Sequence, residues 1–430
     1  MDPIDYLFSL EKLGIKFGLH NINVLCEALG HPERAYRSVI IAGTNGKGSV
    51  SAMVEGALHA AGLATARYTS PHLVRVEERF VLNGRPVDTA SLREVAADMP
   101  AIVARLRERN ELRAEPTFFE VTTAIAFELF RRATVDIAVL EVGMGGRLDA
   151  TSVAPASAAA ITSIDFDHER YLGDTLAQIA FEKAGVVRPG MPVVVGESKA
   201  EPLGVIAGVC HERGAFFVQA REGVRADARL VGGRTELALE TPRRRYPPMV
   251  LALRGRHQVG NAIVAVRLLE ELERLGQPVP ERAVVAGLTE VSWRGRLDLV
   301  STDRGPVLFD GAHNPAGARV LAAYLDEVYP HGVPMVFGAM GDKDAAAMLA
   351  VLLPHVTRLI VTRPRTPRAR PAESLAEIAR GVGNIDIEIV EPAIEALARA
   401  SAFGSPVLVA GSIFLIGDVL ADLGDSARPI

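Results

Sequence analysis

The sequence predicts an α/β protein of two domains, each built on a mostly parallel sheet with helices on both faces. Two observations lead to this class. Short apolar runs typical of buried strands alternate with stretches of helical period from one end of the chain to the other. The length of 430 residues, 49% of them hydrophobic and 23% charged, is also sufficient for two domains with large cores.

The expected strands lie, in order, at 38–42, 64–68, 136–141, 157–163, 191–195, 306–310, 333–338, 356–362 and 405–410. Helical patterns between them cover 89–108, 118–132, 175–187, 257–275, 315–327 and 392–402. Residues 215–253 break this rhythm, because short strand-like runs there surround Gly232-Gly233 and Pro247-Pro248. We expect a small antiparallel patch in that segment.

A domain boundary is expected at Trp293-Arg294-Gly295-Arg296, which follows a long helical region and precedes a new series of strands and helices. Residues 1–294 would then form an N-terminal domain with a mononucleotide-binding parallel sheet. Residues 295–430 would form a C-terminal, Rossmann-like α/β domain.

Charge and composition exclude several classes of function. The formal net charge of −5 argues against a nucleic-acid-binding surface. Cys26 and Cys210 are too few for a disulfide framework or a zinc site. No apolar run reaches the roughly 18 residues of a membrane span, and the N-terminus lacks the basic region of a signal peptide. We expect a cytoplasmic monomer that contacts neither membrane nor nucleic acid.

The most informative segment is Gly43-Thr44-Asn45-Gly46-Lys47-Gly48-Ser49, which follows the apolar run 39–42 and opens a helical stretch. A strand, a glycine loop and a helix N-terminus together offer backbone N–H groups and positive potential to phosphates. Lys47 is suited to the β and γ phosphates, and Ser49 to the accompanying Mg²⁺. The spacing differs from GxxxxGK[ST], but the flanking elements favour a phosphate loop over an ordinary turn.

Other polar segments follow strands in the same region. Glu141 ends the 136–141 strand and is placed to hold Mg²⁺, whereas the glycines after it also fit a tight turn. Asp165-Phe166-Asp167-His168-Glu169 follows the 157–163 strand and is either a ligand cluster or a solvated acidic loop. Each segment alone leaves the reaction open.

In combination and in this order, the motifs closely resemble the Mur ligase superfamily, and within it the folylpolyglutamate synthase and dihydrofolate synthase family. The resemblance covers nearly the whole chain and rests on the phosphate loop together with Ser70-Pro71-His72-Leu73, 141–151, Glu182-Lys183-Ala184-Gly185, 310–315 and Asp342-Lys343-Asp344. Ser152 departs from the asparagine that members commonly carry after Asp-Ala-Thr, which affects local hydrogen bonding only.

The resemblance implies the following site residues. ATP would contact Asn45, Gly46, Lys47, Gly48, Ser49, Asn261, Arg296, Asp310 and His313. One Mg²⁺ would lie near Ser49, Ser70 and Glu141, and a second near His168 and a carbamoylated Lys183. The pterin substrate would lie against Ile15, Lys16, Phe17, Gly18, Thr117, Phe118, Phe119, Glu120, Leu148, Asp149 and Ala150.

Lys183 has two interpretations. A lysine on a helix usually faces water, where it could pair with Glu182 or Asp174. The resemblance implies instead that it has added CO2, because a carbamate is an anion with two oxygens that can ligate Mg²⁺.

The implied reaction is ATP-dependent addition of L-glutamate to a folate, and also to dihydropteroate, through an acyl phosphate with release of ADP and phosphate. Lys47, Glu141, His168 and Lys183 would be the catalytic residues. The alternatives are another Mur-type amino acid ligase and, from a different class, a P-loop kinase or NTPase. Only 42 residues precede Gly43, which leaves little room for the separate uridine-nucleotide domain of a cell-wall ligase.

Overall fold

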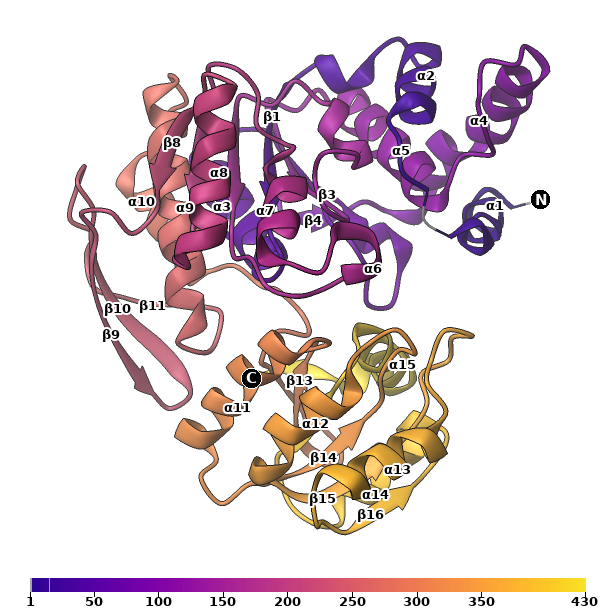
Figure 1. The fold of residues 1–430 in the computed structure, drawn as a ribbon, viewed down its shortest axis with the longest axis vertical. Coiled ribbons are helices and arrows are strands. Elements are labelled where there is room, and N and C mark those ends of the chain that lie inside the picture. The colour runs from indigo at the N-terminus through magenta and orange to yellow at the C-terminus, as the bar shows by residue number, and fades with distance from the viewer. Residues whose placement is uncertain (1, 15) are drawn as a thin grey trace.

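The computed structural model describes residues 2–14 and 16–430, and it shows two α/β units, one above the other in Figure 1. The first contains an eight-stranded sheet in the order β4-β3-β2-β5-β1-β6-β7-β8. Its strands are β1 (Arg37–Ala42), β2 (Thr65–Tyr68), β3 (Phe80–Leu82), β4 (Arg85–Pro86), β5 (Ile137–Glu141), β6 (Ala158–Ile161), β7 (Pro192–Val195) and β8 (Phe216–Gln219). Only β3 and β4 run antiparallel to their neighbours, so the predicted parallel sheet is confirmed.

Helices cover both faces of this sheet. Along β1, Val39 and Ile41 point to one face and Ile40 and Ala42 to the other, because side chains alternate along a strand. The first face is covered by α3 (Lys47–Ala60), α9 (His257–Arg274) and α10 (Glu281–Thr289). The other is covered mainly by α1 (Pro3–Ser9), α2 (His20–Ala28), α4 (Thr89–Glu108), α5 (Phe118–Arg132), α7 (Leu176–Ala184) and α8 (Ala200–Glu212).

The predicted antiparallel patch is present as a three-stranded sheet of β9 (Arg225–Val231), β10 (Arg234–Glu240) and β11 (Met249–Val250). It is narrower than the segment 215–253, because β8 joins the edge of the large parallel sheet. Strands β9 and β10 project from the first unit toward the second (Figure 1). At the tip, the hydroxyl of Tyr324 in the second unit donates to the carbonyl of Gly233 at 3.3 Å.

The second unit is a seven-stranded sheet in the order β16-β15-β14-β17-β13-β12-β18. Its strands are β12 (Asp298–Thr302), β13 (Gly305–Asp310), β14 (Val333–Phe337), β15 (Val356–Val361), β16 (Ile387–Ile389), β17 (Val407–Ala410) and β18 (Arg428–Pro429). One core packs against α11 (Pro315–Val328), α12 (Ala345–Leu352) and α13 (Ala372–Val382), and the other against α14 (Ala393–Ser401) and α15 (Ile413–Leu423). This is the expected Rossmann-like arrangement.

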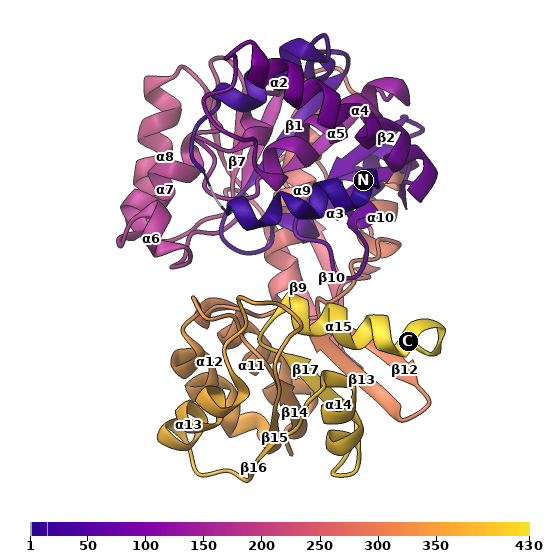
Figure 2. The same cartoon turned by 90° about the vertical axis from the view of Figure 1, so that its right-hand side faces the viewer.

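The two units touch through backbone as well as side chains. Gly417, in α15, lies so close to the first unit that a Cβ there would be 2.0 Å from the carbonyl oxygen of Leu73. Figure 2 shows α15 at the top of the second unit, facing the first. Cys26 and Cys210 are both buried, and neither forms a disulfide in the described parts of the chain. None of the helices in those parts is long and apolar enough to cross a membrane.

Candidate active site

The phosphate-loop segment connects β1 to α3, as the sequence predicts. Gly43 has φ +139° and Gly46 has φ +88°, conformations that favour glycine. A Cβ on Gly43 would lie 1.9 Å from the Thr162 hydroxyl oxygen, so the loop admits no side chain at that position. The Lys47 ammonium folds back over the loop and donates to the carbonyls of Gly43 and Thr44 at 3.0 and 3.1 Å.

Strand order gathers several site residues at one edge. Because β1 lies between β5 and β6 and all three are parallel, their carboxyl ends meet beside the loop. Glu141 ends β5 there, only 5% exposed, and its Oε2 has no hydrogen-bond partner among the residues that the structure describes. Burial raises the pKa of Glu141 against the opposing charges of Lys47 and Arg296, and the Ser70 backbone N–H binds its carboxylate.

An unsatisfied buried carboxylate oxygen is unusual and suits a cation ligand. The Ser49 hydroxyl lies in the first turn of α3, directly after the phosphate loop, and accepts from the Gln258 amide at 3.4 Å. No group of three or more His, Cys, Asp or Glu side chains gathers for a metal within residues 2–14 and 16–430. The buried carboxylate of Glu141 fits an ion such as Mg²⁺, which takes one or two carboxylates and completes its shell with water and phosphate oxygens.

Lys183 is buried and lies at the same edge, on the last turn of α7. The residue is 4% exposed, and its Nζ donates to the Gly43 carbonyl at 2.8 Å. Burial, with the nearby charge of Lys47, lowers the pKa of Lys183 to about 7. The alternative prediction, in which Lys183 faces water and pairs with Glu182 or Asp174, is therefore wrong. Glu182 instead pairs with Arg147 at 2.8 Å.

His168 follows β6 in a left-handed backbone conformation, with φ +53°, and is the residue that precedes α6 (Glu169–Leu172). Burial lowers its pKa to about 4, so the imidazole is neutral at pH 7 and retains a lone pair for a ligand.

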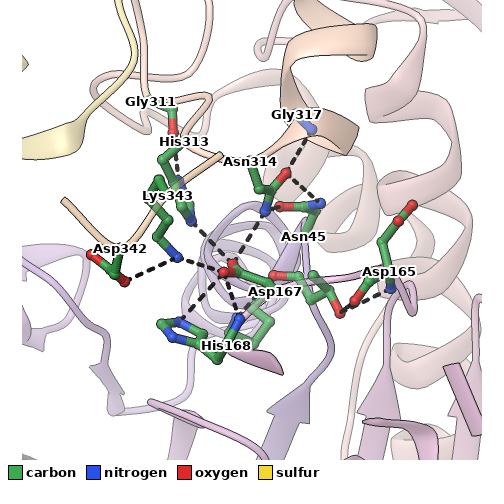
Figure 3. Close-up of polar contacts among 12 residues, drawn as sticks. Asn45, Asp165, Asp167, His168, Gly311, His313, Asn314, Gly317, Asp342 and Lys343 are labelled. Carbon is green, nitrogen blue, oxygen red and sulfur yellow. Dashed lines mark hydrogen bonds and ion pairs between the residues drawn. The ribbon is translucent and has the colours of Figure 1, made fainter. Parts of the chain in front are cut away.

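Asp167 connects the two units through a network of charged and polar groups (Figure 3). Its Oδ1 accepts from the Lys343 ammonium at 2.5 Å, and its Oδ2 lies 3.5 Å from Nε2 of His313 and 3.2 Å from the Asn314 amide nitrogen. Asn314 also exchanges hydrogen bonds with Asn45 of the phosphate loop. Burial alone would raise the pKa of Asp167, but His313, His168 and Lys343 together hold it well below the usual range.

The other predicted nucleotide contacts also lie around the loop. A Cβ on Gly46 would be 2.4 Å from the side-chain oxygen of Asn261, which shows how closely that residue approaches. The charge of Arg296 acts on both Glu141 and Asp310. Asp310 caps the turn after β13, because its two oxygens accept from the backbone N–H groups of Leu297 and Ala312 at 2.9 Å.

Of the predicted substrate residues, 117–120 start α5, and the short helix at 150–153 that Asp149 caps contacts α5. Thr117 and Glu120 form the capping box that starts α5, and the Asp149 carboxylate accepts from Thr151 and from the Met144 N–H. Their side chains thus have structural partners already. Phe17 is half exposed and packs against Tyr171. Ile15 lies outside the described residues.

Lys343 and Asn314 belong to motifs visible in the sequence, but the pattern assigns them no role. The Asp342-Lys343-Asp344 segment follows β14 just as the segments predicted to bind metal follow β5 and β6. The place of this segment after a strand's carboxyl end could have indicated a role in the site. It could not show which of the three side chains would contact the first unit.

The Asp167 network predicts a measurable effect on how the units dock. Asp167→Asn removes the carboxylate charge and leaves the Lys343 ammonium, whose side chain is 10% exposed, with the Asp342 carboxylate at 4.0 Å as its ion-pair partner among the described residues. Breaking a buried pair in this way typically costs about 3–5 kcal/mol. We expect a larger radius of gyration in small-angle scattering of the ligand-free variant.

Asp342→Asn is the matched control, because its carboxylate is 49% exposed, and it should leave the scattering curve unchanged. Adding Lys343→Ala to Asp167→Asn should cause little further change if the two groups act as a pair. Identical curves for the wild type and Asp167→Asn would show that the network does not hold the units together.

Comparison with known proteins identifies the family of the chain. Residues 41–269 match the model of the Mur ligase middle domain, and residues 295–413 match that of the Mur ligase glutamate ligase domain. A Bacillus subtilis protein named dihydrofolate synthase/folylpolyglutamate synthase is 31% identical over 97% of both chains. The chain belongs to the folylpolyglutamate synthase/dihydrofolate synthase family of Mur ligases.

Solved structures of this family superpose on 98% of the chain. A Mycobacterium tuberculosis folylpolyglutamate synthase complexed with ADP and AMPPCP is 33% identical, with a TM-score of 0.91 over 98% of this chain and 99% of that one. A bifunctional folylpolyglutamate synthase/dihydrofolate synthase with Mn, AMPPNP and L-glutamate bound is 31% identical, with a TM-score of 0.84 over 98% of each chain. The two-domain Mur ligase fold is thereby confirmed.

Some family members are longer. A Haloferax volcanii protein named probable bifunctional folylpolyglutamate synthase/dihydropteroate synthase is 35% identical over 97% of this chain, which spans 50% of that relative's length. A Halobacterium salinarum relative of the same name is likewise spanned over about half its length, 51%.

Proposed function

We propose that this protein is an ATP-dependent ligase that adds L-glutamate to a folate, and also to dihydropteroate, with release of ADP and phosphate. The observation that carries this proposal is the meeting of Lys47, Glu141 and Lys183 at one sheet edge, opposite Arg296 and Lys343 from the second unit. Family members crystallised with ADP, and with Mn, AMPPNP and L-glutamate, support it.

The proposed chemistry explains why cations gather there. A carboxylate has no leaving group, so ATP first converts it to an acyl phosphate, which the amino group of glutamate then attacks. Both steps bring anions together, and preorganised positive charge lowers the barrier. Lys47 would hold the β and γ phosphates, and Arg296, with Asp310 beside it, would approach the nucleotide from the second unit. His313 and Asn261 would complete the nucleotide contacts.

Two Mg²⁺ ions are proposed, the first near Ser49, Ser70 and Glu141 and the second near His168 and Lys183. When bound, they would neutralise the phosphates. Lys183 would serve the second ion only after adding CO2, since an ammonium repels a cation whereas a carbamate supplies oxygens. Its pKa of about 7 leaves a substantial fraction as the neutral amine that reacts with CO2.

We propose that the two domains on either side of the expected boundary bind different sets of ligands. Residues 1–294 would bind ATP and the pterin substrate, the latter against 15–18, 117–120 and 148–150, and residues 295–430 would contribute glutamate and nucleotide contacts. The partners are then small molecules only, namely a folate or dihydropteroate, L-glutamate and ATP, and a cytoplasmic monomer is proposed.

The deciding experiment measures ADP release with ATP, Mg²⁺ and L-glutamate while the acceptor is varied. Dihydropteroate, tetrahydrofolate and a methylene-tetrahydrofolate are the acceptors to compare, each with and without glutamate. We expect turnover that requires both acceptor and glutamate, with at least one reduced folate active. Turnover indifferent to folates and glutamate, or a phosphate retained on a stable product, would favour a P-loop NTPase or kinase instead.

A further inference from the structure

Arg79 is a buried arginine that forms no ion pair with a carboxylate of the described residues. It ends the short helix Val76–Arg79 that precedes β3, and it is 7% exposed. Its Nε donates to Nδ1 of His72 at 2.9 Å, and its guanidinium lies 4.9 Å from the ring centroid of Phe118. None of the ion pairs formed within residues 2–14 and 16–430 includes it.

Arg67 is a useful contrast, because it is equally buried, at 8% exposed, but pairs with Glu55 at 3.3 Å. The contacts of Arg79 do not offset its charge in the same way. His72 accepts at Nδ1, so that nitrogen carries no proton and the imidazole supplies no negative charge. Phe118 offers only the face of an aromatic ring. A buried cation without an anion is costly in free energy, so its retention calls for an explanation.

The position of Arg79 suggests what the anion is. His72 follows Ser70 by two residues, and the groups whose charge acts on Arg79 are the Tyr68 hydroxyl, Glu11 and, more weakly, Glu141, the proposed metal ligand. Phe118, which the guanidinium faces, is at the start of α5 in the proposed pterin region, and Phe8 stacks on it with ring centroids 6.0 Å apart. Arg79 thus contacts the aromatic surface at the start of α5 and is within electrostatic reach of Glu141.

We propose that Arg79 binds the carboxylate of the acceptor and holds it between Phe118 and the phosphate loop. This inference rests on the proposed function and names the group that the site recognises. The acceptors share the required chemistry, because an aromatic or glutamyl portion carries the carboxylate that ATP must activate. A guanidinium binds a carboxylate through two parallel hydrogen bonds, which also fixes its orientation.

A binding role predicts a specific relation between stability and affinity. In the free enzyme the Arg79 charge is uncompensated, so an apolar residue of similar length should be tolerated there. In the complex the same charge is paired, so its loss should weaken binding. A purely structural arginine would behave in the opposite way, since its removal would lower the stability of the free protein.

The test compares dihydropteroate with its carboxamide, which has the same shape and no charge. Binding of each, in the presence of ADP, is measured by calorimetry for the wild type, Arg79→Met and Arg79→Lys. Arg75→Met is the control, because Arg75 lies on the same short segment with its side chain 63% exposed. The melting temperature of each ligand-free protein is measured as well.

We expect the wild type and Arg75→Met to prefer the carboxylate by roughly tenfold to a hundredfold, the usual value of a hydrogen bond to a charged group. Arg79→Met should bind both ligands within about twofold of each other, with Arg79→Lys intermediate. The ligand-free melting temperature of Arg79→Met should equal or exceed that of the wild type.

An unchanged preference in Arg79→Met would overturn the inference, and so would a much lower melting temperature or a failure to fold. If the wild type bound ADP but neither acceptor, the proposed function itself would fail together with the inference. If the wild type bound the acceptor normally and Arg79→Met kept the same preference for the carboxylate over the carboxamide, only the role of Arg79 would be overturned.

Discussion

Lys47→Ala is expected to reduce the rate of ADP release by a hundredfold or more, without unfolding the protein. The lysine ammonium is placed over the phosphate loop by the carbonyls of Gly43 and Thr44, so its charge is preorganised before the nucleotide arrives. Removing one preorganised group of this kind commonly costs about 3–4 kcal/mol of barrier. The two lost hydrogen bonds cost only about 1 kcal/mol each in stability.

Steady-state ADP release and the melting temperature, measured on the same preparation, check this prediction. Lys12→Ala is a suitable control, because Lys12 is an exposed lysine outside the phosphate loop. A folded Lys47→Ala protein with near-normal turnover would remove the phosphate loop from the mechanism.

Lys183→Ala is expected to lose most activity, and formate or acetate should restore part of it. The lysine is buried beside Gly43, and burial brings its pKa to about 7, so the neutral amine is available to CO2 near neutral pH. The alanine variant leaves a space in which a short carboxylate can supply the oxygens that the carbamate would have supplied.

Because the neutral fraction of Lys183 grows as the pH rises through 7, recovery of activity after CO2 depletion should be faster at pH 8 than at pH 6. The carbamate itself is detectable by ¹³C NMR of the wild type in labelled bicarbonate, as a signal that Lys183→Ala lacks. Full activity of the alanine variant, without added carboxylate, would contradict the assignment.

Much of the fold could be predicted from the sequence, because buried parallel strands are continuous apolar runs and helices have their own period. The helices predicted at 89–108 and 118–132 have those bounds in the structure, since Asp88 and Thr117 cap their N-termini. The short edge strands β16 and β18 carry too few residues for a recognisable pattern.

The candidate site was predictable where it depends on position along a strand, as with Glu141 and the phosphate loop. Contacts between the units were not. Asp167 and Lys343 are 176 residues apart, and their ion pair exists only because two separately folded sheets meet with their carboxyl edges opposed. No local sequence pattern around either residue specifies the other as its partner. Likewise, no local pattern predicts that Arg79 is buried outside the ion pairs of the described residues.

The contact between Gly417 and the Leu73 carbonyl has a consequence for hybrid enzymes. A Cβ at position 417 would lie 2.0 Å from that oxygen, so the two backbones approach more closely than any other amino acid permits. Exchanging residues 295–430 for the equivalent part of a relative should therefore preserve the relative placement of the domains only when the donor has glycine at this position. In chimeras that lack glycine at position 417, each domain should fold, but the two domains should not come together to form the shared site.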